Sequence, residues 1–137
     1  MYDPADDRLN SFNGDGYTTK FDELYGNVHT IRLAEMYLIR AEANFRQGTA
    51  VGDKPVNDIN VIRNRVNLPS YTAAQLTLSK ILLERRLELA FEGFALDDLK
   101  RLQGSVGNLS WNSPRLIFPI PKRELNVNPN LTQNEGY

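Results

Sequence analysis

The chain has 137 residues and carries 16 lysines and arginines against 17 aspartates and glutamates, which gives a formal net charge of -1. That balance argues against a nucleic-acid binder and against a polybasic membrane-surface protein, because both classes carry a surplus of basic side chains. Cysteine is absent, which excludes disulfides, thiolate nucleophiles and cysteine-ligated metal ions.

The first 30 residues are expected to form an extended arm. Glycines at positions 14, 16 and 26 supply turn signals, and no helical periodicity connects them. A short strand is predicted around residues 17–19, where Tyr and Thr favour extended backbone.

A strong helix is predicted over residues 31–46, with Thr30 as its N-cap and Gly48 as its C-cap glycine. Apolar residues repeat along it at helical spacing in two strips. One strip holds Ala34, Tyr37, Leu38, Ala41 and Phe45, and the second holds Leu33, Met36 and Ile39. A helix that is apolar on two sides usually packs between two partners.

A second helix is predicted over residues 55–66, with Asp53 as N-cap, Pro55 in the first turn and Pro69 beyond its end. The stripe on its apolar face consists of Val56, Ile59, Ile62 and Val66. Together with the first helix it looks like one tetratricopeptide-type hairpin, which cannot bury both of its faces alone.

A third helix is predicted to begin at Thr77 or Ser79 and to end at about Phe91. Gly93 interrupts the pattern, and a short helical continuation follows over residues 95–102. Its apolar residues form two adjoining strips, so this helix also has more apolar surface than one neighbour can cover.

The remaining residues are expected to form an extended tail, because four prolines and many asparagines replace the helical pattern. Its apolar segment, residues 116–121, is predicted to lie across the helices and to bury Ile117, Phe118 and Ile120. The predicted fold is therefore all-α, with tetratricopeptide-like hairpins at residues 31–103, an arm at 1–30 and a tail at 104–137, in one domain.

Five segments, in the same order, resemble the SusD/RagB family. They are residues 7–9 with 18–20, residues 31–43, residues 60–69, residues 84–93 with 98–101, and residues 118–121 with 128–137. The most distinctive is ERRLELAFEG at 84–93, followed by DLKR. The chain departs from the pattern at residues 94–96, Phe-Ala-Leu, where many members carry an arginine and an aromatic residue.

The resemblance implies an outer-membrane lipoprotein of Bacteroidetes-type bacteria that binds glycan at the cell surface without catalysis. It also implies two partners, an oligosaccharide and a SusC-like TonB-dependent transporter, and no cofactor. The matching segments belong to the C-terminal portion of the family. We therefore expect the chain to be a fragment that serves mainly as scaffold, with the export signal and anchor cysteine outside it.

Two aromatic residues are candidates for carbohydrate contact. Trp111, the single tryptophan, lies in a polar loop with Asn108, Ser110 and Asn112, whose side chains suit sugar hydroxyls. Tyr71 lies in the linker between the second and third helices and is the weaker candidate. Aromatic rings stack on the apolar C–H faces of sugars, but a tryptophan packed under its own loop fits the same sequence.

Catalytic and metal-binding alternatives are weaker. Glu84, Glu88 and Glu92 could act as acid and base in glycoside cleavage, but ion pairs along the helix, such as Arg85 with Glu88, explain their spacing better. The acidic residues of the arm do not have the spacing of a calcium loop, and the single histidine, His29, fits a surface loop. The sequence therefore predicts no catalytic residue and no metal site.

A second class of function remains open. The two-sided first helix is also what a docking module would present to the transporter or to another surface protein.

Overall fold

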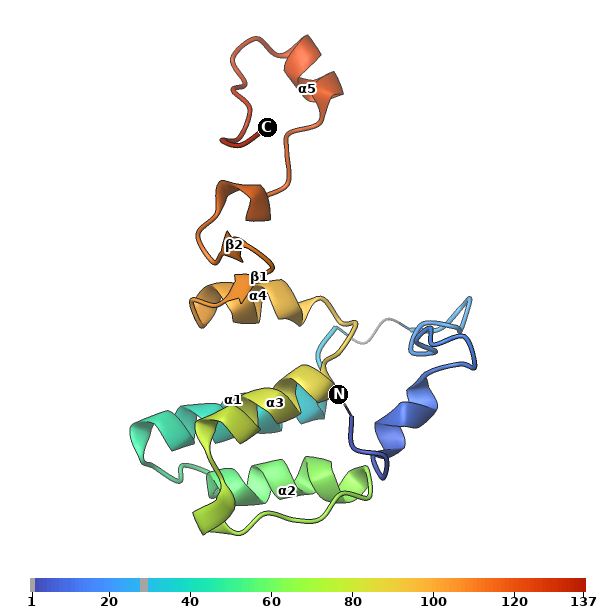
Figure 1. The fold of residues 1–137 in the computed structure, drawn as a ribbon, viewed down its shortest axis with the longest axis vertical. Coiled ribbons are helices and arrows are strands. Elements are labelled where there is room, and N and C mark those ends of the chain that lie inside the picture. Colours follow the sequence, from blue (N-terminus) through green and yellow to red (C-terminus); the bar gives the residue numbers. More distant parts are fainter. Residues whose placement is uncertain (1, 28–29) are drawn as a thin grey trace. The chain divides into compact units, whose positions relative to one another are not determined.

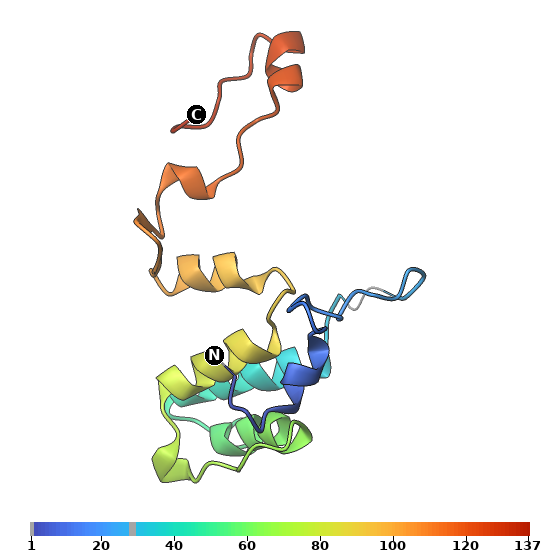
Figure 2. The same cartoon turned by 45° about the vertical axis from the view of Figure 1, so that its right-hand side comes forward.

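The computed structural model describes residues 2–27 and 30–137, so the prediction for His29 lies outside the described residues. The chain divides into two compact units, Met1–Glu92 and Gly93–Tyr137. Most of the regular structure is helical, which confirms the all-α prediction (Figures 1 and 2). Within the described part of the chain, no helix has the length and apolar character needed to cross a membrane.

Three helices build the first unit: α1 (Leu33–Gln47), α2 (Pro55–Arg65) and α3 (Leu78–Glu88). Helix α1 packs against both of the others, as the predicted tetratricopeptide-like arrangement requires. The apolar side chains between the three helices are buried, and they come from every one of them. They are Leu38 and Ala41 of α1, Ile59 and Ile62 of α2, and Ile81 of α3.

Two helix ends agree with the sequence. Gly48 ends α1 in the left-handed conformation, with φ 65°, where a residue without Cβ carries little strain. Thr77 caps α3, because its side chain accepts a hydrogen bond from the backbone N–H of Lys80. Both helix ends could be predicted from the sequence because each depends on one residue type at one position.

Two predicted N-caps were wrong. Helix α1 has Arg32 as its N-cap rather than Thr30, and α2 has Lys54 rather than Asp53. Asp53 lies one residue earlier and still serves the helix start. Its carboxylate accepts from the backbone N–H of Lys54 at 2.7 Å and from the amide of Asn57 at 2.7 Å.

Helix α3 ends at Glu88, three residues before the predicted end at Phe91. Phe91 has φ 68° and Gly93 has φ 88°, so the backbone cannot continue as a right-handed helix through this stretch. The ring of Phe91 packs edge-to-face on Phe12, with centroids 5.6 Å apart.

The N-terminal segment is less extended than predicted. Residues Asp7–Ser11 form a 3-10 helix that Asp6 caps through its side chain. The predicted strand is reduced to one antiparallel bridge between Phe12 and Thr18. Backbone hydrogen bonds from Asn13 to Tyr17 and from Thr19 to Ser11 flank this bridge.

The second unit consists of short elements. They are α4 (Phe94–Arg101), the antiparallel pair β1 (Ser105–Val106) and β2 (Leu109–Ser110), and α5 (Lys122–Val127). The sequence did not predict α5, which lies in the region expected to be extended. The side-chain amide of Gln133 bonds to the backbone N–H and C=O of Ile120 at 2.8 and 3.0 Å.

In the apolar segment of the tail, two of the three residues predicted to be buried are exposed, and Ile120 is half-buried. Phe118 is 88% exposed, and Ile117 is also exposed. Packing of this tail on the helices stays a prediction.

Candidate functional site

Trp111 directly follows strand β2 in a closed turn of the second unit. The hydroxyl of Ser110 donates to the side-chain oxygen of Asn112 at 2.8 Å, and the backbone N–H of Ser113 donates to the C=O of Ser110 at 2.9 Å. These bonds fix the backbone on both sides of the indole. Trp111 keeps 38% of its surface exposed. The side chain therefore packs partly on its loop and still presents surface to solvent.

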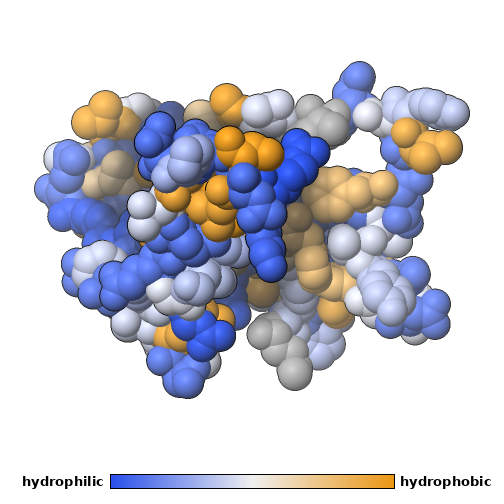
Figure 3. All heavy atoms as spheres, turned by 90° about the horizontal axis from the view of Figure 1, so that it is seen from above, coloured by the Kyte–Doolittle hydropathy of each residue, from blue (hydrophilic) through white to orange (hydrophobic). Residues whose placement is uncertain are grey.

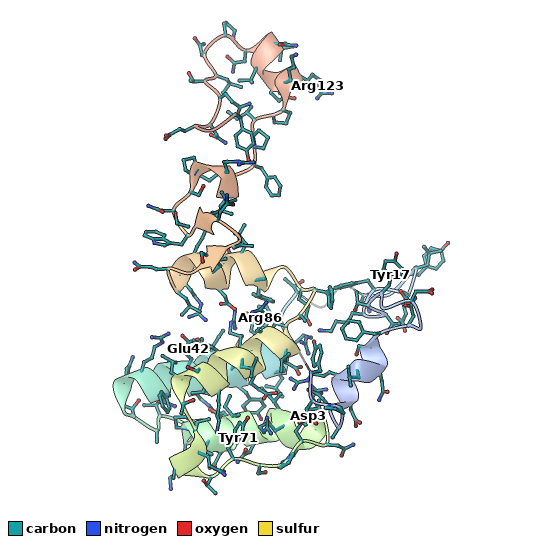
Figure 4. The ribbon with its side chains drawn as sticks, in the orientation of Figure 1. Asp3, Tyr17, Glu42, Tyr71, Arg86 and Arg123 are labelled. Atoms are coloured by element: carbon teal, nitrogen blue, oxygen red, sulfur yellow. The ribbon has the colours of Figure 1, made fainter. Side chains whose placement is uncertain are left out.

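Tyr71 lies in the first unit, beside α2 (Figure 4). The side-chain amide of Asn60 bonds to both backbone groups of Tyr71, each at 2.8 Å. The guanidinium of Arg63 lies 3.9 Å from the ring centroid, and Lys80 Nζ lies 4.5 Å from it. Such cation–π contacts occupy ring surface that a stacked sugar would need, so the geometry favours Trp111 over Tyr71. The two aromatics belong to different units, so neither unit contains both.

The glutamates of α3 belong to a buried charge cluster. Glu84 is 2% exposed, and its carboxylate contacts Arg8 Nη1 at 2.7 Å and Arg63 Nη1 at 3.2 Å. Glu88 is 3% exposed and contacts Arg32 at 3.0 Å and Arg65 at 2.6 Å. A third guanidinium, that of Arg8, lies 3.5 Å from Glu88 Oε2.

The charge cluster includes two further carboxylates, Asp6 and Glu92. Asp6 binds Arg8 through a fork of hydrogen bonds, with Nη2 2.6 Å from the carboxylate. Beyond the end of α3, Glu92 accepts hydrogen bonds from Lys20 Nζ at 2.7 Å and from Arg32 Nη2 at 2.8 Å. The described pairs thus connect the N-terminal segment, the start of α1 and the end of α2 to α3.

Burial raises the pKa of the Asp6 carboxyl, but hydrogen bonds from Arg8 outweigh it and the net pKa lies below its ordinary value. Burial likewise raises the pKa of Glu92, and the bonds from Arg32 and Lys20 bring it below the usual range. Glu92 is therefore ionised at neutral pH, whereas a general acid must hold a proton there.

The cluster as a whole suits a structural role. Arginines contact the buried carboxylates of Glu84 and Glu88 inside the unit, so a sugar has no room to bind between the two carboxylates. Pairing was expected along the helix, whereas the described pairs of Glu88 run to other elements. Among the described residues, no group of three or more histidines, aspartates and glutamates is placed to hold a metal ion.

Sequence reasoning missed one group of aromatic residues. Tyr17, Phe21 and Tyr25 are all exposed on the segment before α1. The signal was present, because three aromatic residues lie close together in a stretch that is rich in turn residues and was not expected to be helical.

Comparison with known proteins identifies similar sequences and structures. The model of the SusD family matches residues 8–115. The starch-binding protein SusD of Bacteroides thetaiotaomicron is 36% identical over 124 residues, covering 81% of this chain and 22% of that protein. A SusD superfamily protein from Bacteroides vulgatus has a TM-score of 0.73 at 27% identity, covering 98% of this chain and 36% of that one. Surface glycan-binding protein A from Bacteroides uniformis has a TM-score of 0.72 at 25% identity, covering 98% and 39%.

The chain is short beside these proteins. It spans 22% of the starch-binding protein and 26% of a SusD-like protein from Formosa agariphila to which it is 35% identical.

Proposed function

We propose that this chain, which belongs to the SusD family, is one segment of a protein that binds glycan at the cell surface without cleaving it. One observation carries the proposal: the 36% identity to a protein named for binding starch. The surface glycan-binding protein A of Bacteroides uniformis, whose name also states glycan binding, shares the fold at 25% identity. The buried, arginine-paired glutamates of α3 are consistent with a binder, since they are committed to holding the first unit together.

The partners and the location are part of the same proposal. The parent protein would lie on the outer membrane and pass an oligosaccharide to a SusC-like TonB-dependent transporter. The three helices of the first unit would serve as scaffold, because the buried charged side chains between them pair with one another. Contact with the sugar would come from Trp111, on the second unit.

The general test is binding of the parent protein to starch, laminarin, xylan and mannan, measured by affinity electrophoresis. Retardation by at least one polysaccharide is expected. Migration unchanged by every one of them would refute glycan capture.

Replacing Trp111 by alanine is expected to weaken glycan affinity of the parent protein about tenfold or more, since burying one aromatic side chain is worth about 1.5–3 kcal/mol. The measurement is isothermal titration with maltoheptaose, or with an oligosaccharide of whichever polysaccharide binds. Trp111→Phe is the matched control and should retain most of the affinity, because it keeps an aromatic ring on the same turn. Equal affinity of Trp111→Ala and wild type would exclude this residue from the site.

A docking function is the second candidate, and exposed apolar side chains favour it. Leu33, Met36 and Ile39 are exposed on α1, on the side away from its buried residues, and Leu83 is exposed on α3. Hydrophobic residues also reach the surface among hydrophilic ones on the face that Figure 3 shows. Apolar side chains that gather on one exposed side of a helix favour an interaction surface.

The docking function predicts that Met36→Glu with Ile39→Glu abolishes co-purification of the transporter with the parent protein. Glutamate keeps the helix propensity of α1 but places charge on the apolar strip. Val51→Glu, at an exposed position in the turn between α1 and α2, is the control. Recovery of the transporter in equal yield with the double variant would count against docking through this strip.

A further inference from the structure

We propose that residues 13–27, here called the aromatic arm, make a second glycan contact, separate from Trp111. The inference rests on the proposed function and adds a site to it. Tyr17 is 73% exposed, Phe21 62% and Tyr25 96%, so the three rings contribute little to the core of the first unit. Figure 4 shows Tyr17 on the arm, away from the three packed helices of that unit.

The start of the arm is held in a fixed turn. The side-chain oxygen of Asn13 accepts from the backbone N–H of Asp15 at 3.1 Å and from that of Tyr17 at 2.9 Å. The backbone N–H of Asn13 donates to the C=O of Tyr17 at 2.8 Å, and Thr19 donates to Ser11 at 2.8 Å. Tyr17 therefore projects from a closed loop rather than from a free end.

Lys20 tethers the middle of the arm to the end of α3. Its ammonium donates to the C=O of Glu88 at 3.0 Å, to the C=O of Ala90 at 2.9 Å and to the carboxylate of Glu92 at 2.7 Å. All three donor positions of the ammonium are thus used. Tyr17 and Phe21 flank this tether, so the segment that carries them loses less conformational entropy when a ligand stacks on the rings than a free segment would.

The chemistry of the arm indicates an uncharged oligosaccharide. Its rings can stack on the C–H faces of sugars, and carboxylates accept hydrogen bonds from hydroxyl groups. Asp15, Asp22 and Glu23 are exposed, and their side chains make no bond to any described residue. Three unpaired carboxylates repel an anionic lipid surface or a sulfated or uronic-acid glycan, which leaves neutral sugars as the fitting class.

The test compares Phe21→Ala with Tyr25→Ala, made together, against Phe118→Ala in the parent protein. Phe118 is a matched control because it is 88% exposed and lies outside the arm. The ligand is maltoheptaose, or an oligosaccharide of whichever of the four polysaccharides binds the wild-type parent protein. The double variant should bind it about tenfold or more weakly, and Phe118→Ala should bind it like wild type. Tyr25→Phe should retain most of the affinity, because stacking needs the ring and not the hydroxyl.

Each outcome decides the proposal. Unchanged affinity of the double variant, with wild-type circular dichroism, overturns the arm as a glycan contact and leaves glycan capture intact. Absence of binding by the wild-type parent protein to all four polysaccharides overturns both. An equal loss of affinity in Phe118→Ala also overturns it, because the effect would then follow from removing any exposed ring.

Discussion

Replacing Glu88 by glutamine is expected to lower the free energy of unfolding by about 3–5 kcal/mol, the range typical of removing one partner from a buried ion pair. The Glu88 side chain is 2% exposed and faces arginines from three separate elements. Loss of its charge leaves Arg8, at 8% side-chain exposure, with less compensation inside the unit. The amide of glutamine would also point N–H groups at guanidinium donors.

The measurement is urea denaturation followed by far-UV circular dichroism, which reports on helices α1 to α3. Glu23→Gln makes the same chemical change at an exposed position and should shift the unfolding free energy by less than about 0.5 kcal/mol. The double variant with Glu84→Gln should lose less than the sum of the single losses, because both glutamates contact Arg8. A loss below about 1 kcal/mol for Glu88→Gln would contradict a structural role for the cluster.

Periodicity and single-residue signals predicted the helical framework. The 3.6-residue repeat placed Leu38 and Ala41 on the core face of α1, and both are fully buried. Gly48 and Thr77 marked helix ends correctly. The resemblance to the SusD/RagB family also held, as the match over residues 8–115 shows.

Contacts between distant parts of the sequence were not predictable in this way. Arg8 and Glu84 are 76 positions apart. The residues next to Arg8 in the sequence do not show whether its side chain is buried or solvated. At the early end of α3, Lys20 donates to the C=O of Glu88 and Ala90 from 68 and 70 positions away, and the ring of Phe91, whose φ is 68°, packs on Phe12.

The candidate site was predictable only in part. The sequence placed Trp111 in a polar loop, and the structure shows the hydrogen bonds that close it. For Tyr71 the decisive neighbours are Arg63, eight residues earlier, and Lys80, nine residues later. Only the folded arrangement of the first unit brings both cations to the same ring, so sequence spacing alone could not rank the two aromatics.

Leu38→Ala is expected to cost about 2–5 kcal/mol of unfolding free energy, since it removes a fully buried side chain and leaves a cavity. Helix α1 packs against both α2 and α3, so a cavity at Leu38 weakens the element on which the other two helices depend. Leu33→Ala is the control, because it makes the same change five residues earlier on the same helix, where the side chain is 68% exposed. Its expected effect is within about 0.5 kcal/mol. Equal losses for the two variants in urea denaturation would show that the exposed strip of α1 is covered in solution, as a docked or self-associated state requires.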